Sequence, residues 1–160
     1  MKNPIRIGIY FGLTSGIITT LGLMVGLESG TDSALAVIGG VITIAVADAF
    51  SDALGMHISQ ESIRNTGPKA VWESTLSTFA AKFLFAMTFV VPLLLFYNSL
   101  TMAVTISVLW GLLLLGMLSF RIANEKKEKT WKVVAEHLGI ALAVIFIAHY
   151  VGDLVAILFH

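Results

Sequence analysis

The sequence predicts an all-α integral membrane protein, built as a bundle of five transmembrane helices in a single transmembrane domain, 1–160. Of its 160 residues, 57% are hydrophobic and only 12% are charged, whereas about a quarter of the residues in a soluble domain are charged. The mean hydropathy, +0.90, is also high. Five apolar stretches are each long enough to cross a hydrocarbon core that needs about 20 helical residues. These stretches are 7–27, 34–58, 76–97, 102–120 and 133–159.

The first stretch is interpreted as a membrane span. It has full span length, unlike the short hydrophobic region of a cleaved signal peptide, and it lacks a small-residue cleavage site. Gly8, Gly12 and Gly16 recur every four residues within it. This spacing puts small residues on one helix face and favours close approach of a second helix. The pattern predicts a homodimer in which span one packs against its own copy across a two-fold axis.

The four later stretches are joined by short links, and the positions of Lys and Arg orient them. Basic residues are retained on the cytoplasmic side of a membrane. Five spans with a cytoplasmic N terminus and a C terminus on the opposite side satisfy this bias at every link. Lys82 lies inside the third stretch, and we expect its long stem to extend back to the cytoplasmic surface. The basic residues outside the spans are Lys2, Arg6, Arg64, Lys69, Arg121, Lys126, Lys127, Lys129 and Lys132.

The second stretch, "VITIAVADAFSDALGMHIS", contains two aspartates four residues apart, Asp48 and Asp52. On a helix they lie only about 40° apart around the axis. Ser51 and Gly55 fall on the same side, and Met56 borders it. A charged carboxylate at bilayer depth costs at least about 2.5 kcal/mol unless it faces a cavity, a partner or a cation. Protonated aspartates that only join helices by hydrogen bonds are one interpretation; a cation or proton pathway is the one we favour.

Other polar residues allow simpler interpretations. His57 points away from Asp48 and is expected at the cytoplasmic interface. His149 and Asp153 are four residues apart and can face each other, either as a simple hydrogen-bonded pair or as part of an ion relay. The basic run "RIANEKKEKTWK" is expected to be a solvated loop at the lipid headgroups.

Several classes of function are disfavoured. The chain has no cysteine, which excludes disulfides, thiolate metal sites and cysteine catalysis. It contains no phosphate-binding glycine loop, no HExxH pair and no nucleophile elbow. We therefore expect no enzyme activity, no tightly bound cofactor and no nucleic-acid partner. Membrane lipid, a metal ion and a second copy of the chain are the expected partners.

Two segments carry a family resemblance. "FGLTSGIITTLGLMVGL" resembles the first span of the vacuolar iron transporter family, whose pattern is close to F-G-L-x-D-G-[IL]-[VI]-T-T-x-G-L-x-x-G. "ADAFSDALGMHIS" is similar to the family's second span, A-x-[GA]-x-S-M-x-x-G-E-Y-[LV]-S. The resemblance implies a five-span protomer, a homodimer with the first spans at its centre, and export of Fe2+ or a related divalent ion from the cytoplasm, often against protons.

The chain also departs from the family pattern. Ser15 stands at the position of the family's intramembrane Asp, Asp52 at its Met, and Met56 at its Glu. The link after the second span is too short for the cytoplasmic metal-binding domain that many members carry. On this resemblance Asp48 and Asp52 replace the missing carboxylate and Met56 remains a soft donor near them. Ser15 and Thr19 contribute hydroxyls along span one.

The expected function is therefore transport of a divalent metal cation, Fe2+ or Mn2+, out of the cytoplasm and coupled to protons. Its expected metal ligands are Asp48, Asp52, Met56, Ser15 and Thr19. Oxygen ligands without cysteine or a central histidine favour Mn2+, Fe2+, Ca2+ or Mg2+ over copper and zinc. Two alternatives stay open: a proton-linked carrier of another solute, and a membrane scaffold subunit that transports nothing.

Overall fold

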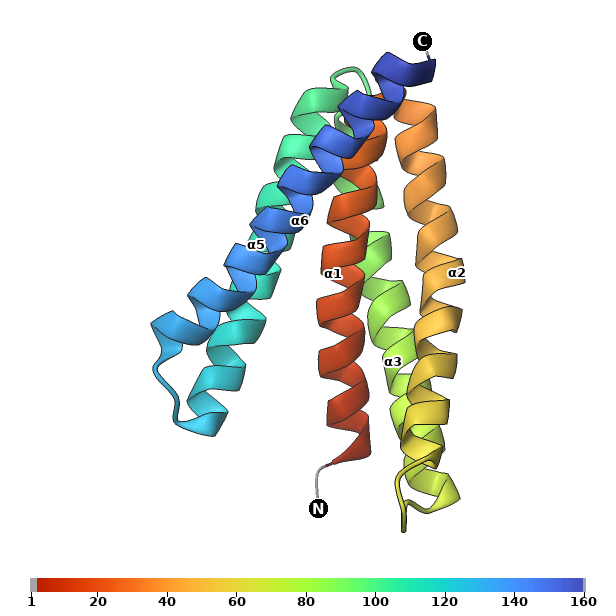
Figure 1. Ribbon diagram of the computed structural model, residues 1–160, viewed down its shortest axis with the longest axis vertical. Coiled ribbons are helices and arrows are strands. Elements are labelled where there is room, and N and C mark those ends of the chain that lie inside the picture. Colours follow the sequence, from red (N-terminus) through yellow and green to blue (C-terminus); the bar gives the residue numbers. More distant parts are fainter. Residues whose placement is uncertain (1–2, 160) are drawn as a thin grey trace.

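The computed structural model describes residues 3–159, and every regular element in that range is a helix (Figure 1). Five segments are long and apolar enough to cross a membrane, which identifies a multi-pass membrane protein and confirms the predicted helical class. The helices are α1 (Pro4–Thr31), α2 (Ala34–Glu61), α3 (Pro68–Thr88), α4 (Val90–Leu95), α5 (Leu100–Lys126) and α6 (Thr130–Phe159).

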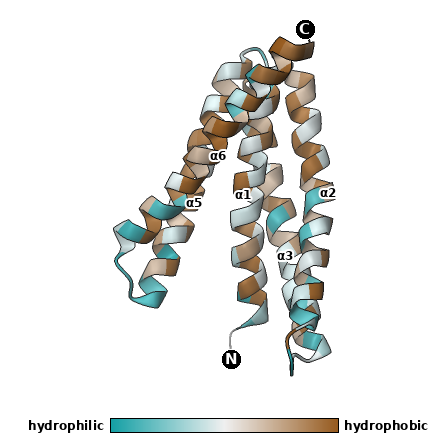
Figure 2. Ribbon diagram, viewed as in Figure 1, coloured by the Kyte–Doolittle hydropathy of each residue, from teal (hydrophilic) through white to brown (hydrophobic). Residues whose placement is uncertain are grey.

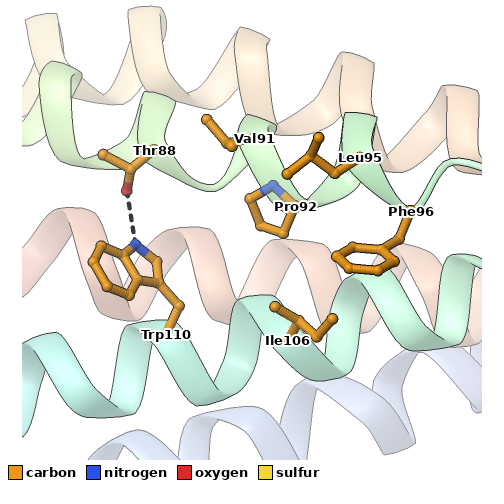
Figure 3. A pocket seen from close by; sticks show the side chains of 7 residues that line it. All are labelled: Thr88, Val91, Pro92, Leu95, Phe96, Ile106 and Trp110. Carbon is orange, nitrogen blue, oxygen red and sulfur yellow. Dashed lines mark hydrogen bonds between the residues drawn. The ribbon is translucent and has the colours of Figure 1, made fainter.

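The third span differs most from its predicted bounds. It begins at Pro68, eight residues before the predicted start at position 76, and it is broken at Phe89 into α3 and α4. Proline cannot donate a backbone hydrogen bond, and its ring collides with the carbonyl four residues earlier. Pro92 therefore disturbs the backbone at Thr88, whose hydroxyl accepts a hydrogen bond from the Trp110 indole at 3.2 Å (Figure 3). α4 and α5 border an apolar pocket of about 450 Å³ at this break.

α1 contacts α2, α3, α5 and α6. Its first half packs against α3 through Gly8, Gly12 and Gly16, all of which are buried. A Cβ atom added at Gly12 would lie 2.5 Å from the Thr78 carbonyl oxygen, and one at Gly16 would lie 3.2 Å from that of Lys82. The glycine face predicted to form a dimer seam is thus covered by α3 of the same chain, and that role for these glycines is wrong. The homodimer itself stays a prediction.

The second half of α1 carries another row of glycines, which packs against α6. A Cβ atom at Gly26 would lie 3.3 Å from the Ala148 carbonyl oxygen, and one at Gly30 would lie 3.2 Å from that of Gly152. Two rows of small residues on different faces of α1 therefore hold two different helices close. Without a hydrophobic force between helices in lipid, such close contact is a main source of helix association.

Hydrophilic residues gather at one end of the bundle (Figure 2). This end, called the N-terminal end below, holds the start of α1, the α2–α3 link (62–67) and the α5–α6 link (127–129). Arg6 forms an ion pair with Glu125 of α5, and Tyr10 donates a hydrogen bond to the same carboxylate. Midway along their length, α2 and α3 also carry hydrophilic residues, and these form the candidate site.

Candidate functional site

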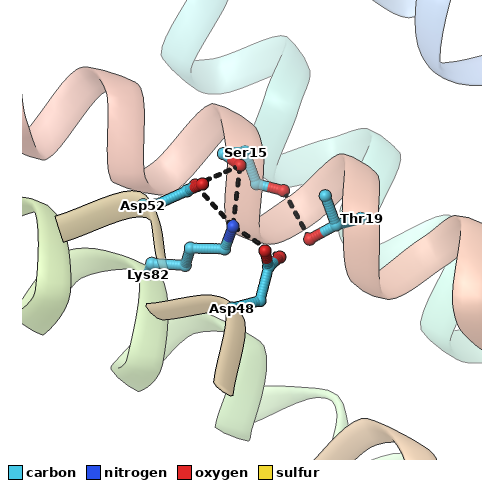
Figure 4. A network of polar contacts seen from close by, with 5 residues as sticks. All are labelled: Ser15, Thr19, Asp48, Asp52 and Lys82. Carbon is cyan, nitrogen blue, oxygen red and sulfur yellow. Dashed lines mark hydrogen bonds and ion pairs between the residues drawn. The ribbon is translucent and has the colours of Figure 1, made fainter. Parts of the chain in front are cut away.

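The candidate site is a cluster of charged and hydroxyl side chains from α1, α2 and α3 (Figure 4). α2 contributes Asp48 and Asp52, which lie near the middle of that helix, as the sequence predicted. One helical turn separates them, so both carboxylates lie on the side of α2 that faces α1 and α3. The structure brings four predicted residues, Asp48, Asp52, Ser15 and Thr19, into one region.

Lys82 of α3 lies between the two carboxylates. Its Nζ atom lies 2.5 Å from Oδ2 of Asp48 and 2.5 Å from Oδ2 of Asp52. The Lys82 side chain is only 1% exposed, whereas those of Asp48 and Asp52 are 25% and 20% exposed. The ammonium group is the most enclosed member of the cluster.

The expectation that Lys82 extends to the cytoplasmic surface is therefore wrong. The predicted span began at position 76, which placed Lys82 near the cytoplasmic end of the helix, but α3 begins at Pro68. Position 82 is fourteen residues beyond position 68, a rise of about 21 Å along a helix. A lysine side chain cannot cover that distance, so its charge needs a partner inside the bundle. The glycine–proline pair at Gly67 and Pro68 is the sequence signal for the earlier helix start.

Hydroxyl groups of α1 complete the cluster. Ser15 Oγ donates to Asp52 Oδ2 at 2.6 Å and accepts from Lys82 Nζ at 2.9 Å. Thr19 Oγ1 donates to the Ser15 carbonyl oxygen at 2.9 Å. Ser15 thus joins all three helices at one point, while Thr19 satisfies its hydroxyl within α1.

The two carboxylates are held unequally. Asp52 accepts hydrogen bonds from both Lys82 and Ser15. Asp48 Oδ2 lies as close to the ammonium, but in the part of the chain that the structure describes this oxygen has no partner with hydrogen-bond geometry. With all three groups charged, two carboxylates and one ammonium leave one net negative charge. Asp48 is therefore the carboxylate with an oxygen available to accept a further hydrogen bond or to bind a cation.

The outer side of α2 next to the carboxylates is open. An exposed row of small residues recurs there every four positions, and a Cβ atom added at Gly39 or Gly55 would have nothing within 4 Å. In a bilayer this arrangement leaves parts of Asp48 and Asp52 beside lipid, an unfavourable position for a charge. The members of this row, called the α2 small-residue row below, are Gly39, Thr43, Ala47, Ser51, Gly55 and Ser59.

Met56 lies one turn beyond Asp52 toward the N-terminal end, and it is 9% exposed. Its predicted role as a soft metal ligand stays a prediction. His57 lies outside the cluster: its Nδ1 atom is 3.1 Å from Thr75 Oγ1, and its ring packs edge-on against Trp72.

A second polar group lies at the other end of the bundle. His149 Nε2 is 3.5 Å from Asp153 Oδ2, which confirms that these residues face each other. Ser29 of α1 donates to Asp153 and to the His149 carbonyl oxygen. The contact with Ser29 was not predicted, because it joins residues more than a hundred positions apart.

Within residues 3–159, no group of three or more His, Asp or Glu residues is placed to hold a metal ion. One chain thus offers two carboxylates, two hydroxyls and an ammonium group. An ammonium group between carboxylates occupies space that a metal ion would need. The cluster can exchange protons or bind a cation, but a full metal coordination shell requires Lys82 to move or further ligands to arrive.

The chain matches no protein-family model, no curated protein sequence and no solved structure. The resemblance to the vacuolar iron transporter family therefore stays a prediction.

Proposed function

We propose that this protein is a proton-linked transporter that moves a divalent cation, Fe2+ or Mn2+, out of the cytoplasm along α2. The observation that carries the proposal is the surplus of negative charge in the cluster. Asp48 and Asp52 share one ammonium group, midway along a span. Ionisable residues at this depth generally belong to ion or proton pathways.

A purely structural ion pair needs only one carboxylate for Lys82. Burying charges is costly, and a second carboxylate adds cost without a second counter-charge. A proton or a cation that binds reversibly would supply the missing positive charge. The surplus carboxylate thus supports an exchangeable ion in preference to fixed helix-to-helix contacts.

Two copies of the chain balance the charge of a divalent ion better than one copy does. Each copy contributes one net negative charge, so two clusters that face each other would balance one divalent ion. The α2 small-residue row would let two α2 helices approach closely beside Asp48 and Asp52. We therefore propose a homodimer whose seam is α2, in place of the glycine face of span one.

The donor chemistry supports a hard ion. Asp48, Asp52, Ser15 and Thr19 all offer oxygen, and Met56 is the single sulfur donor near them. Carboxylates and hydroxyls suit Fe2+ and Mn2+ better than copper, and the lack of thiolate or central imidazole argues against a zinc site.

Lys82 favours a second candidate, a proton-linked carrier of another solute. In a single chain one proton is enough to neutralise the cluster, and no metal is required. In this function Asp48, the less well bonded carboxylate, would carry the proton. Lys82 would stay paired with Asp52 by direct contact.

Flux through purified protein in lipid vesicles tests both candidates. The variants are Asp48→Asn, Asp52→Asn and the double change, with Asp153→Asn as a matched control at the other end of the bundle. A fluorescent metal indicator and a pH indicator inside the vesicles report the two fluxes. The first proposal expects Fe2+ or Mn2+ flux with opposite proton movement, lost in the double variant and kept in the control.

Proton movement without metal flux would favour the second candidate. Absence of both fluxes in wild-type vesicles, or full metal flux in the double variant, would contradict the transport pathway proposed here.

A further inference from the structure

A vestibule lies at the N-terminal end of the bundle, between the start of α1 and the α2–α3 link. Its volume is about 470 Å³. Pro4 and Ile7 line it from α1, and Gln60, Asn65 and Thr66 contribute polar groups. A hollow with amide and hydroxyl groups at the end of the helices is suited to water.

The pairing of α1 with α2 relates this vestibule to the charged cluster. Ser15 lies opposite Asp52, to which it is hydrogen bonded. Twelve residues farther along, a Cβ atom at Gly40 would meet the Leu27 side chain, so the antiparallel register holds along the pair. One turn toward the N-terminal end, this register sets Phe11, which is 44% exposed, opposite Met56.

The next turn sets Ile7 opposite Gln60, and both of these residues line the vestibule. Asp52 and Gln60 are eight residues apart, which is about 12 Å along the helix. Met56 lies between them on the same face of α2 and is 9% exposed. In the part of the chain that the structure describes, one pair of facing apolar residues, Phe11 and Met56, thus lies between the vestibule and the cluster.

From Asp48 toward the start of α2, more apolar residues separate the cluster from the end of the bundle. Beyond Asp48 the register pairs Leu23 with Ile44 and then Leu27 with Gly40. The side chain of Leu27 lies directly over Gly40. By this register, two pairs of facing apolar positions lie between the cluster and the opposite end of the bundle, whereas one pair lies between the cluster and the vestibule.

We infer that the vestibule is the entry to the cluster and that Met56 is the barrier between them. In this conformation the cluster therefore receives its ion from the N-terminal end of the bundle. The inference rests on the proposed transport function and adds its route. Methionine is unbranched and adapts its shape easily, so a change of rotamer at Met56 can open the passage without a movement of helices.

Thiol labelling tests the route without any measurement of flux. The natural chain has no cysteine, so Ser15→Cys is a single reporter inside the cluster. A small, charged, impermeant thiol reagent is added to vesicles from the N-terminal side. The labelling rate is compared in three backgrounds: the natural Met56, Met56→Ala and Met56→Leu.

Truncation to alanine should raise the rate by about tenfold or more, because the reagent no longer waits for a local opening. Leucine keeps an apolar side chain of similar size but is branched, so it should leave the rate unchanged or lower it. An Ile44→Cys reporter in the natural background should stay unlabelled from either side. A rate that is equal in all three backgrounds, or faster labelling of Ile44→Cys than of Ser15→Cys, would overturn the inference.

Should Met56→Ala fail to fold, Met56→Val provides the smaller side chain. The labelling result stands even if the protein transports no metal, so the two proposals fail separately.

Discussion

Lys82 of α3 donates a hydrogen bond of 2.5 Å to Asp52 of α2, in the middle of the membrane-spanning bundle. The contact joins residues thirty positions apart and encloses the ammonium group almost completely. It makes the aspartates members of an acid–lysine cluster with one surplus negative charge. The ammonium group of Lys82 therefore balances part of the carboxylate charge within the protein.

Removal of Lys82 should destabilise the fold strongly. Lys82→Met leaves two carboxylates without a counter-charge, and breaking a buried ion pair from one side costs about 3–5 kcal/mol. Thermal unfolding in detergent measures the change. Adding Asp48→Asn and Asp52→Asn to Lys82→Met should recover much of the loss, since no charge then remains. A triple variant as unstable as Lys82→Met would contradict the ion-pair explanation.

Gly12 should be needed for the contact between α1 and α3. Gly12→Ala places a methyl group 2.5 Å from the Thr78 carbonyl oxygen, and overpacking of this kind costs about 1–3 kcal/mol. Gly116→Ala is a suitable control, because a Cβ atom there has nothing within 4 Å. That control should be neutral or gain about 0.5–1 kcal/mol, since alanine is the better helix former. Equal melting temperatures for the two variants would argue against the close packing.

The proposed dimer seam on α2 can be examined by cross-linking. Ser51→Cys lies in the α2 small-residue row, so two copies should join through a disulfide when a mild oxidant is added to membranes. Leu109→Cys is exposed on α5 and should stay monomeric under the same conditions. Gly55→Leu should reduce the dimer fraction seen by native mass measurement. Cross-linking at position 109 but not at position 51 would place the seam elsewhere.

The predicted orientation puts the N terminus in the cytoplasm. Ser62→Cys and Asn98→Cys occupy exposed links at opposite ends of the bundle. An impermeant thiol reagent added outside intact cells should label position 98 and leave position 62 unlabelled until the membrane is permeabilised. The reverse pattern would mean that the basic residues face outward, and the direction of transport would then need to be reassigned.

The sequence by itself determined that the protein is a helical membrane protein, and it identified two carboxylates of the site, Asp48 and Asp52. Five runs of apolar residues predicted five spans, because a bilayer demands a minimum length of apolar helix. Helical periodicity placed Asp48 and Asp52 on one face, and their cost in lipid marked them as functional candidates. These inferences need only the local geometry of a single helix.

Only the tertiary structure decided which helix faces pack against one another. In a membrane both the protein interior and the lipid are apolar, so hydrophobicity does not indicate how each helix is rotated or which neighbour it contacts. For this reason Gly8, Gly12 and Gly16 could be assigned to a dimer seam although they pack against α3. Lys82 could equally be assigned to the surface, since its two carboxylate partners belong to another helix. The ion pair depends on the position and rotation of α3 relative to α2, which packing of the whole bundle sets.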